Sequence, residues 1–142
     1  MKKYEILEHT ADFKIRVFGK TKRELFENAL RGMFEGAKYE PFFPKATEDK
    51  GEKIKRKIKI SSLDLPSLLV DFLNEALYLA EVNQEVYFGV NFENFSEKEI
   101  EGTLIGKKLK RMGVQIKGVT YHDLDIHQRK DGSWEATVLF DI

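Results

Sequence analysis

The sequence predicts an α+β fold, a two-layer sandwich in which two helices pack on one face of a largely antiparallel sheet. Two segments have helical periodicity, six to eight others alternate like strands, and most of the strands are joined by short turns. The 142 residues fit one domain, 1–142, because folding at this length hides roughly two-thirds of the unfolded chain's surface.

The N-terminal part predicts two strands and a helix. Residues 4–8 and 13–18 alternate in polarity, and residues 8–12 connect them. A capping box at Thr21 and Glu24, in which Glu24 reaches back to the Thr21 amide, predicts the helix start. Gly36 is the expected stop. The apolar face of this helix consists of Leu25, Phe26, Ala29, Leu30, Met33 and Phe34.

A loop at 39–51 with Pro41 and Pro44 precedes a predicted strand at 53–60. Its alternation gives one basic face, which consists of Lys53, Lys55, Lys57 and Lys59. Such a stripe can hold phosphate, or it can be a solvated face that protects an edge strand from pairing with another chain. We favour the solvated edge.

The rest of the chain predicts a longer helix and a strand meander. Asp64 and Pro66 mark the helix start. Strands follow at 85–95 and 100–105, and a change of phase across Gly118 predicts a β-bulge. Asp131 and Gly132 predict a hairpin between 124–126 and 134–140. The apolar face of the helix consists of Leu68, Leu69, Phe72, Leu73, Ala76, Leu77 and Ala80.

Composition excludes several classes of protein. Basic and acidic residues both number 24, so no net charge draws the chain to nucleic acid or membrane, and such contact needs a local patch. The absence of cysteine excludes disulfides, thiolate catalysis and zinc-thiolate sites. Every apolar run is far shorter than the ~20 residues that span a bilayer, and the N-terminal residues are charged, so we expect a cytoplasmic protein without a membrane span.

The two ends of the chain carry the candidate chemistry. His9 and Asp12 lie between the first two strands, and Asp141 adjoins the terminal carboxylate of Ile142. Adjacent carboxylates repel each other unless a cation or a lysine lies between them. Either the ends share a site, or they are frayed and solvated.

A second candidate lies on the strand after Tyr121. Alternation places Asp123, Asp125 and His127 on one face, where they bind a metal or merely face solvent. His122 shares the other face with apolar neighbours, so we expect it to be partly buried.

The sequence offers no catalytic assembly of its own. No nucleophile motif, glycine-rich phosphate loop or His-Glu-x-x-His pattern occurs, so no residue is predicted to be catalytic. A metal-dependent phosphohydrolase with His9 or His122 as base is the alternative, and an RNA-binding or chaperone-like module that uses the 53–59 stripe is another.

Motifs spread over most of the chain resemble the archease family, the accessory proteins of the tRNA-splicing RNA ligase. The order and spacing of these motifs carry the resemblance. They are His9-Thr10-Ala11-Asp12, Gly19-Lys20-Thr21, Leu25 to Ala29, Gly32-Met33-Phe34, Leu68 to Tyr78, Lys117 to His122 and Val138 to Ile142. Residues 106–114 are shorter than is usual in that family, and Gly118 replaces a more typical alanine.

The resemblance implies a non-enzymatic activator that promotes guanylylation and turnover of the ligase in tRNA splicing and contacts RNA only through the ligase. It implies a divalent cation, with calcium expected and magnesium or manganese as alternatives. The ligands carried over are Asp12, Asp141 and the carboxylate of Ile142. His9 and Lys117 are the residues that would face the partner.

Overall fold

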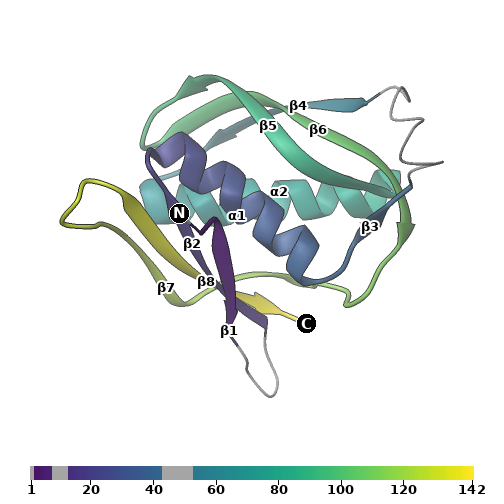
Figure 1. The fold of residues 1–142 in the computed structure, drawn as a ribbon. Helices are drawn as coiled ribbons and strands as arrows, with labels where there is room; N and C mark the ends of the chain where they lie inside the picture. The colour runs from purple at the N-terminus through teal and green to yellow at the C-terminus, as the bar shows by residue number, and fades with distance from the viewer. Residues whose placement is uncertain (1, 8–12, 43–52) are drawn as a thin grey trace.

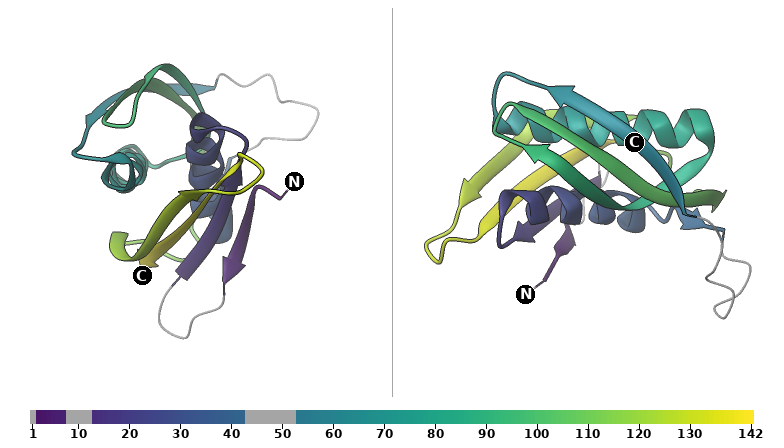
Figure 2. Two further views of the ribbon diagram at one scale, coloured as in Figure 1. Left: turned by 90° about the vertical axis from the view of Figure 1, so that its left-hand side faces the viewer. Right: turned by 90° about the horizontal axis from the view of Figure 1, so that it is seen from above.

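Two helices lie between two antiparallel sheets of four strands each (Figure 1). This computed structural model describes residues 2–7, 13–42 and 53–142. Both helices contact strands of both sheets, and the views along other axes show them between the sheets (Figure 2). The predicted α+β class with antiparallel pairing and two helices is confirmed. The strands are, however, divided between two sheets that cover the helices from opposite sides.

The first sheet has the order β1 (Tyr4–Leu7), β2 (Phe13–Gly19), β8 (Trp134–Asp141) and β7 (Gly118–Gln128). The C-terminal strand β8 is therefore internal, with β2 on one side and β7 on the other. Alternate residues of β8 enter the core, and Ala136, Val138 and Phe140 are fully buried. The opposite face of β8 carries Glu135 and, by alternation, Asp141.

In the second sheet β6 (Glu99–Arg111) is the central strand. It pairs with β4 (Ile54–Ser61) and the short β3 (Glu40–Pro41) on one side and with β5 (Glu85–Phe95) on the other. The predicted strands at 53–60 and 85–95 are confirmed, and β6 is longer than predicted. Loss of alternation after residue 105 in the sequence hid its second half.

Helix α1 (Lys22–Gly36) begins at the predicted N-cap. Thr21 Oγ1 accepts a hydrogen bond from the Glu24 amide at 3.1 Å. Glu24 Oε1 accepts from the amide of Lys20 at 3.1 Å, one residue before the predicted partner Thr21. Gly36 is the last helical residue, and a Cβ there would lie 2.4 Å from the ring of Phe13. The helix thus packs against β2 as closely as glycine allows.

Helix α2 (Leu65–Asn83) has Asp64 as N-cap, with Oδ1 accepting from the Ser67 amide at 2.8 Å. That backbone hydrogen bond lowers the pKa of Asp64. All seven residues of the predicted apolar face are buried. Phe26 of α1 and Phe72 of α2 are in ring contact at 5.6 Å, which joins the helices in the core. No helix in the described ranges is both long and apolar enough to cross a membrane.

The bulge predicted at Gly118 is wrong in position. Strand β7 begins at Gly118, and its pairing with β8 shifts between Thr120 and Asp125, where Asp123 has φ 57°. Residues 112–117 are not part of a strand. The alternation of polar and apolar residues between this segment and 119–121 therefore does not reflect strand pairing. The predicted 131–132 hairpin is confirmed, with Gly132 at φ 89°.

A buried carboxylate connects β4 with β5. Glu85 is 2% exposed and accepts from Arg56 at 2.9 and 2.6 Å and from the Tyr87 hydroxyl at 2.7 Å. Burial by itself would raise the pKa of Glu85, but the hydrogen bonds from Arg56 and Tyr87 outweigh it and lower the pKa. Burial and the neighbouring carboxylate raise the pKa of Tyr87.

Candidate functional site

Three chain segments meet where β8 ends (Figure 1). Phe140 is the register partner of Phe13, the first residue of β2, and their rings stack at 5.1 Å with an interplanar angle of 27°. Asp141 is the register partner of Gly118, the first residue of β7. The chain's last residues therefore emerge between the starts of β2 and β7.

The structure places three of the five predicted site residues at this end. Asp141, Ile142 and Lys117 are exposed there, and the Lys117 amide donates to the Asp141 carbonyl at 2.7 Å. His9 and Asp12 lie outside the described residues. Asp12 is the covalent neighbour of Phe13, whose register partner precedes Asp141. The predicted meeting of the two chain ends is thus supported as far as Phe13.

The segment before β7 is fixed by the end of α1. Carbonyls of Ala37 and Lys38 accept from the amides of Val114 and Gly113, both at 2.9 Å. The hydroxyl of Tyr39 accepts from the Ile116 amide at 3.2 Å. Burial raises the pKa of Tyr39, so this hydroxyl stays neutral at ordinary pH. Lys117 directly follows Ile116, so these hydrogen bonds also fix the position of the Lys117 backbone.

Asn74 of α2 holds the start of β7. Its Oδ1 accepts from the Val119 amide at 2.9 Å, and its Nδ2 donates to the Val119 carbonyl at 3.5 Å. The side chain thus acts as a strand partner on the side of β7 that no described strand occupies. Sequence reasoning quoted Asn74 only as part of a motif. The signal in the sequence that could have identified Asn74 is its polar amide side chain, which stands between the core residues Leu73 and Leu77.

The donors at this end suit a hard cation. The Asp141 side chain has no hydrogen-bond or ion-pair partner within residues 2–7, 13–42 and 53–142, and the carboxylate of Ile142 is its neighbour. Carboxylate oxygens suit calcium, magnesium or manganese better than zinc. Across the described ranges no three His, Asp or Glu side chains are grouped to hold a metal. The described residues therefore offer an incomplete donor set, with Asp12 outside it.

The alternative metal face on β7 is divided. Asp125 Oδ2 lies 2.6 Å from His127 Nδ1, whereas Asp123 Oδ2 lies 3.5 Å from Lys14 Nζ and 3.6 Å from His122 Nε2. The positive φ of Asp123 interrupts the alternation that the prediction assumed. The predicted partial burial of His122 is also wrong. Its side chain is 76% exposed, since the interrupted alternation does not turn it toward the core.

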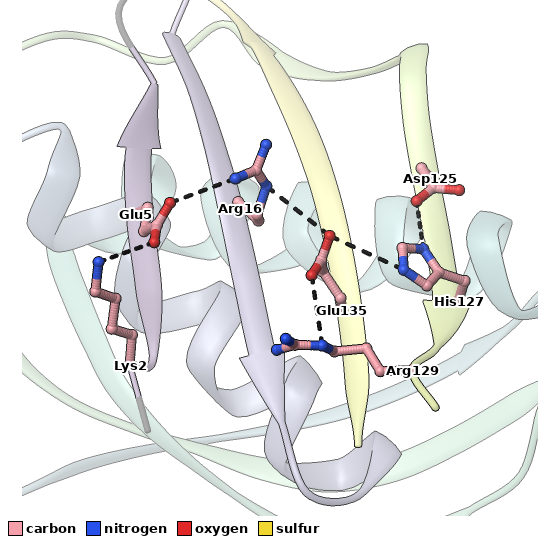
Figure 3. Close-up of polar contacts among 7 residues, drawn as sticks. All are labelled: Lys2, Glu5, Arg16, Asp125, His127, Arg129 and Glu135. Carbon is pink, nitrogen blue, oxygen red and sulfur yellow. Dashed lines mark hydrogen bonds and ion pairs between the residues drawn. The ribbon is translucent and has the colours of Figure 1, made fainter. Parts of the chain in front are cut away.

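An ion-pair network covers the outer face of the first sheet (Figure 3). Glu135 of β8 lies 3.9 Å from each of three cationic or imidazole groups, which belong to Arg16, His127 and Arg129. Arg16 also pairs with Glu5 at 3.5 Å. The network connects all four strands of the sheet that carries Asp141.

The basic stripe of β4 is exposed along its length. Lys53, Lys55, Lys57 and Lys59 all face solvent, and Lys59 lies 3.5 Å from Glu101. Among the described strands β4 pairs only with β6, so it is an edge. These observations agree with the solvated, protective edge.

Comparison with known proteins adds the family to this geometry. A family model described as "Archease protein family (MTH1598/TM1083)" matches residues 4–142. The chain belongs to the archease family. The family resemblance read from the sequence is thereby confirmed.

Relatives and solved structures match over nearly full length. Protein archease of Methanosarcina mazei is 38% identical, with 99% of this chain and 97% of the relative covered. Protein archease of Pyrococcus furiosus is 34% identical, with both chains covered completely. A crystal structure of an archease, possible chaperone, from Thermotoga maritima has a TM-score of 0.66 at 20% identity, covering 96% of this chain and 94% of the other. The likeness to that structure shows the fold.

A solution structure from Methanobacterium thermoautotrophicum, protein 1598, has a TM-score of 0.65 at 25% identity, and both chains are covered completely. The family's fold is therefore seen over the whole described chain.

Proposed function

We propose that this member of the archease family activates the tRNA-splicing RNA ligase. In this proposal the protein promotes guanylylation of the ligase and its repeated turnover, and it performs no chemistry of its own. The observation that carries the proposal is the end of β8, where Asp141 is exposed and unpaired among the described residues. A carboxylate pair presented in this way is available to another molecule.

The same proposal includes a divalent cation held by Asp12, Asp141 and the terminal carboxylate of Ile142. Calcium is the expected ion, and magnesium or manganese are the alternatives. When bound, the cation supplies a local positive charge with room for further oxygen ligands. The residues of this chain contribute the carboxylates, and without a cation these would repel each other.

Three contacts hold the residues around the end of β8 in place. The stacked rings of Phe13 and Phe140 fix the approach of β2 to β8. Asn74 fixes the start of β7, and the hydrogen bond from the Lys117 amide fixes the carbonyl of Asp141. We define Asp12, Asp141 and the terminal carboxylate of Ile142 as the acidic tip. It docks at the mouth of the ligase active site, with Lys117 and His9 facing the partner.

Single-turnover guanylylation of the ligase with GTP tests the proposal. The wild-type protein should accelerate the reaction, and Asp141→Ala should abolish the acceleration. Asp125→Ala is the matched control, because it removes an exposed aspartate of the neighbouring strand away from the tip. Activation that survives Asp141→Ala, or is lost equally in Asp125→Ala, would contradict the proposal.

A further inference from the structure

A groove of about 680 Å³ lies beside the start of β8, at the opposite end of that strand from the acidic tip. Its walls come from the start of α1, the β5–β6 turn and the β7–β8 hairpin, on the left of Figure 1. Trp134 and Asp141 are the first and last residues of β8, and the seven steps between them at about 3.3 Å each place them roughly 23 Å apart. The groove is therefore separate from the acidic tip.

Two cations of this groove lie against aromatic rings. Lys22 Nζ lies 5.1 Å from the ring centre of Trp134, and the Arg23 guanidinium lies 6.0 Å from that of Phe95. Lys20 adds a third cation; Lys20 and Arg23 are exposed and Lys22 is half-buried, and Glu97 is the one carboxylate among the lining residues. The chain as a whole has no net charge, so this is a local concentration of positive charge.

An anion in this groove would be bound by the lysine and arginine side chains and not by the backbone amides of α1. Thr21 and the carboxylate of Glu24 already accept from amides at the start of α1. Lys22 pairs with Glu97 at 2.8 Å, but Glu97 is 65% exposed. Exposed pairs of this kind stabilise little, so a phosphate can replace Glu97 as the partner of Lys22.

We propose that this groove binds single-stranded RNA, with phosphates on Lys20, Lys22 and Arg23 and a base stacked against Trp134. Single strands present repeated phosphates together with planar apolar bases, which matches cations that lie against rings. An acidic peptide supplies the charge without the rings, and a duplex keeps its bases stacked inside. The inference is independent of ligase activation and adds a direct RNA contact to a chain expected to meet RNA only through its partner.

Trp134 is the only tryptophan of the chain, so its fluorescence reports directly on the groove. Titration with a ten-nucleotide oligouridine should quench it. With three phosphate contacts the affinity should fall about 20-fold between 50 and 200 mM salt, since each contact releases counterions from the strand. Unchanged fluorescence at saturating RNA, measured in parallel by anisotropy of labelled RNA, would overturn the proposal.

Charge variants locate the contact. Lys22→Ala with Arg23→Ala should weaken binding at least tenfold. Lys55→Ala with Lys57→Ala, which removes two exposed lysines from β4, should leave it unchanged. Glu97→Gln should tighten binding, because it removes the carboxylate that competes for Lys22. Equal losses in the two double variants would overturn the proposal.

Two further arms test the base contact and the independence from the ligase. Length-matched polyphosphate and polyglutamate should bind more weakly than RNA and leave Trp134 unquenched; equal affinity and quenching would overturn the base contact. The Lys22 and Arg23 variant should still accelerate guanylylation of the ligase when no RNA is present. The RNA-binding assay and the guanylylation assay therefore distinguish a failure of this proposal from a failure of the proposed ligase activation.

Discussion

Phe13 and Phe140 are register partners whose rings stack at 5.1 Å, and each is the covalent neighbour of an aspartate that we propose as a metal ligand. The contact lies between residues 127 positions apart in the sequence, at the start of β2 and near the end of β8 (140 − 13 = 127). Packing of the two rings therefore connects the fold's core to the acidic tip.

Phe140→Leu should lower both stability and activation. Phe140 is fully buried, so losing the ring should cost about 1–2 kcal/mol of unfolding free energy, within the range for a shape-changing core substitution. The tip should also be less well oriented, and more protein should be needed for half-maximal ligase guanylylation. Phe26→Leu, a fully buried ring near the start of α1 that contacts Phe72, is the control in thermal denaturation and in the ligase assay. Equal loss of activation in both variants would mean that stability alone explains the effect.

An added glycine after Ile142 should weaken cation binding. The extra residue moves the terminal carboxylate by up to about 3.6 Å while leaving every side chain unchanged. Calcium affinity measured by titration calorimetry should fall at least tenfold, because the carboxylate no longer adjoins Asp141 in the same geometry. Asp125→Asn, which keeps the chain end, should bind as the wild type does. Undiminished affinity in the extended protein would exclude the terminal carboxylate as a ligand.

Asn74→Ala should loosen the start of β7. Val119 is 9% exposed, and in this variant its backbone amide loses its hydrogen-bond acceptor. Leaving a buried donor without a partner costs about 1–3 kcal/mol of unfolding free energy. Hydrogen exchange at Val119 should accelerate, and ligase activation should weaken. Asn91→Ala removes an exposed amide of β5 and is the matched control. Unchanged exchange at Val119 would show that the Asn74 hydrogen bonds contribute nothing to local stability.

Glu85→Gln should destabilise the protein at neutral pH and much less in acid. The folded-state pKa of Glu85 lies below its ordinary value of 4.5, so its ionised form stabilises the fold above that pH, and the contribution disappears as pH falls through the folded pKa. Urea denaturation of both proteins should give curves that differ most near pH 7 and approach each other as the pH falls below 4.5 and through the folded-state pKa.

Tyr87→Phe is the companion variant. It removes one hydrogen bond to Glu85 but leaves the pair with Arg56. It should therefore keep most of the pH dependence. A constant difference between wild type and Glu85→Gln across this pH range would show that the charge of Glu85 is not involved.

Local chemistry made much of the secondary structure predictable. Thr21 and Asp64 cap helices where their side chains accept neighbouring amides, and Gly132 turns a hairpin with a positive φ. Each of these depends on residues within a few positions. The bulge at Gly118 was wrong because residues 112–117 form no strand, and the burial of His122 was wrong because Asp123 interrupts the alternation of β7. Lys38, whose carbonyl accepts the Gly113 amide, instead helps to hold 112–117 outside any strand.

The sequence by itself determined the α+β class, the start of both helices and the end of the first, the apolar faces and the resemblance to the archease family. These features follow from periodicity, capping and motif order, which are properties of neighbouring residues. The tertiary structure alone decided that the strands form two sheets, that Asn74 holds Val119, and that Lys22 meets Trp134 in a basic groove. Those relationships join residues far apart in the chain, and they arise because burying the apolar faces of both helices needs a sheet on each side.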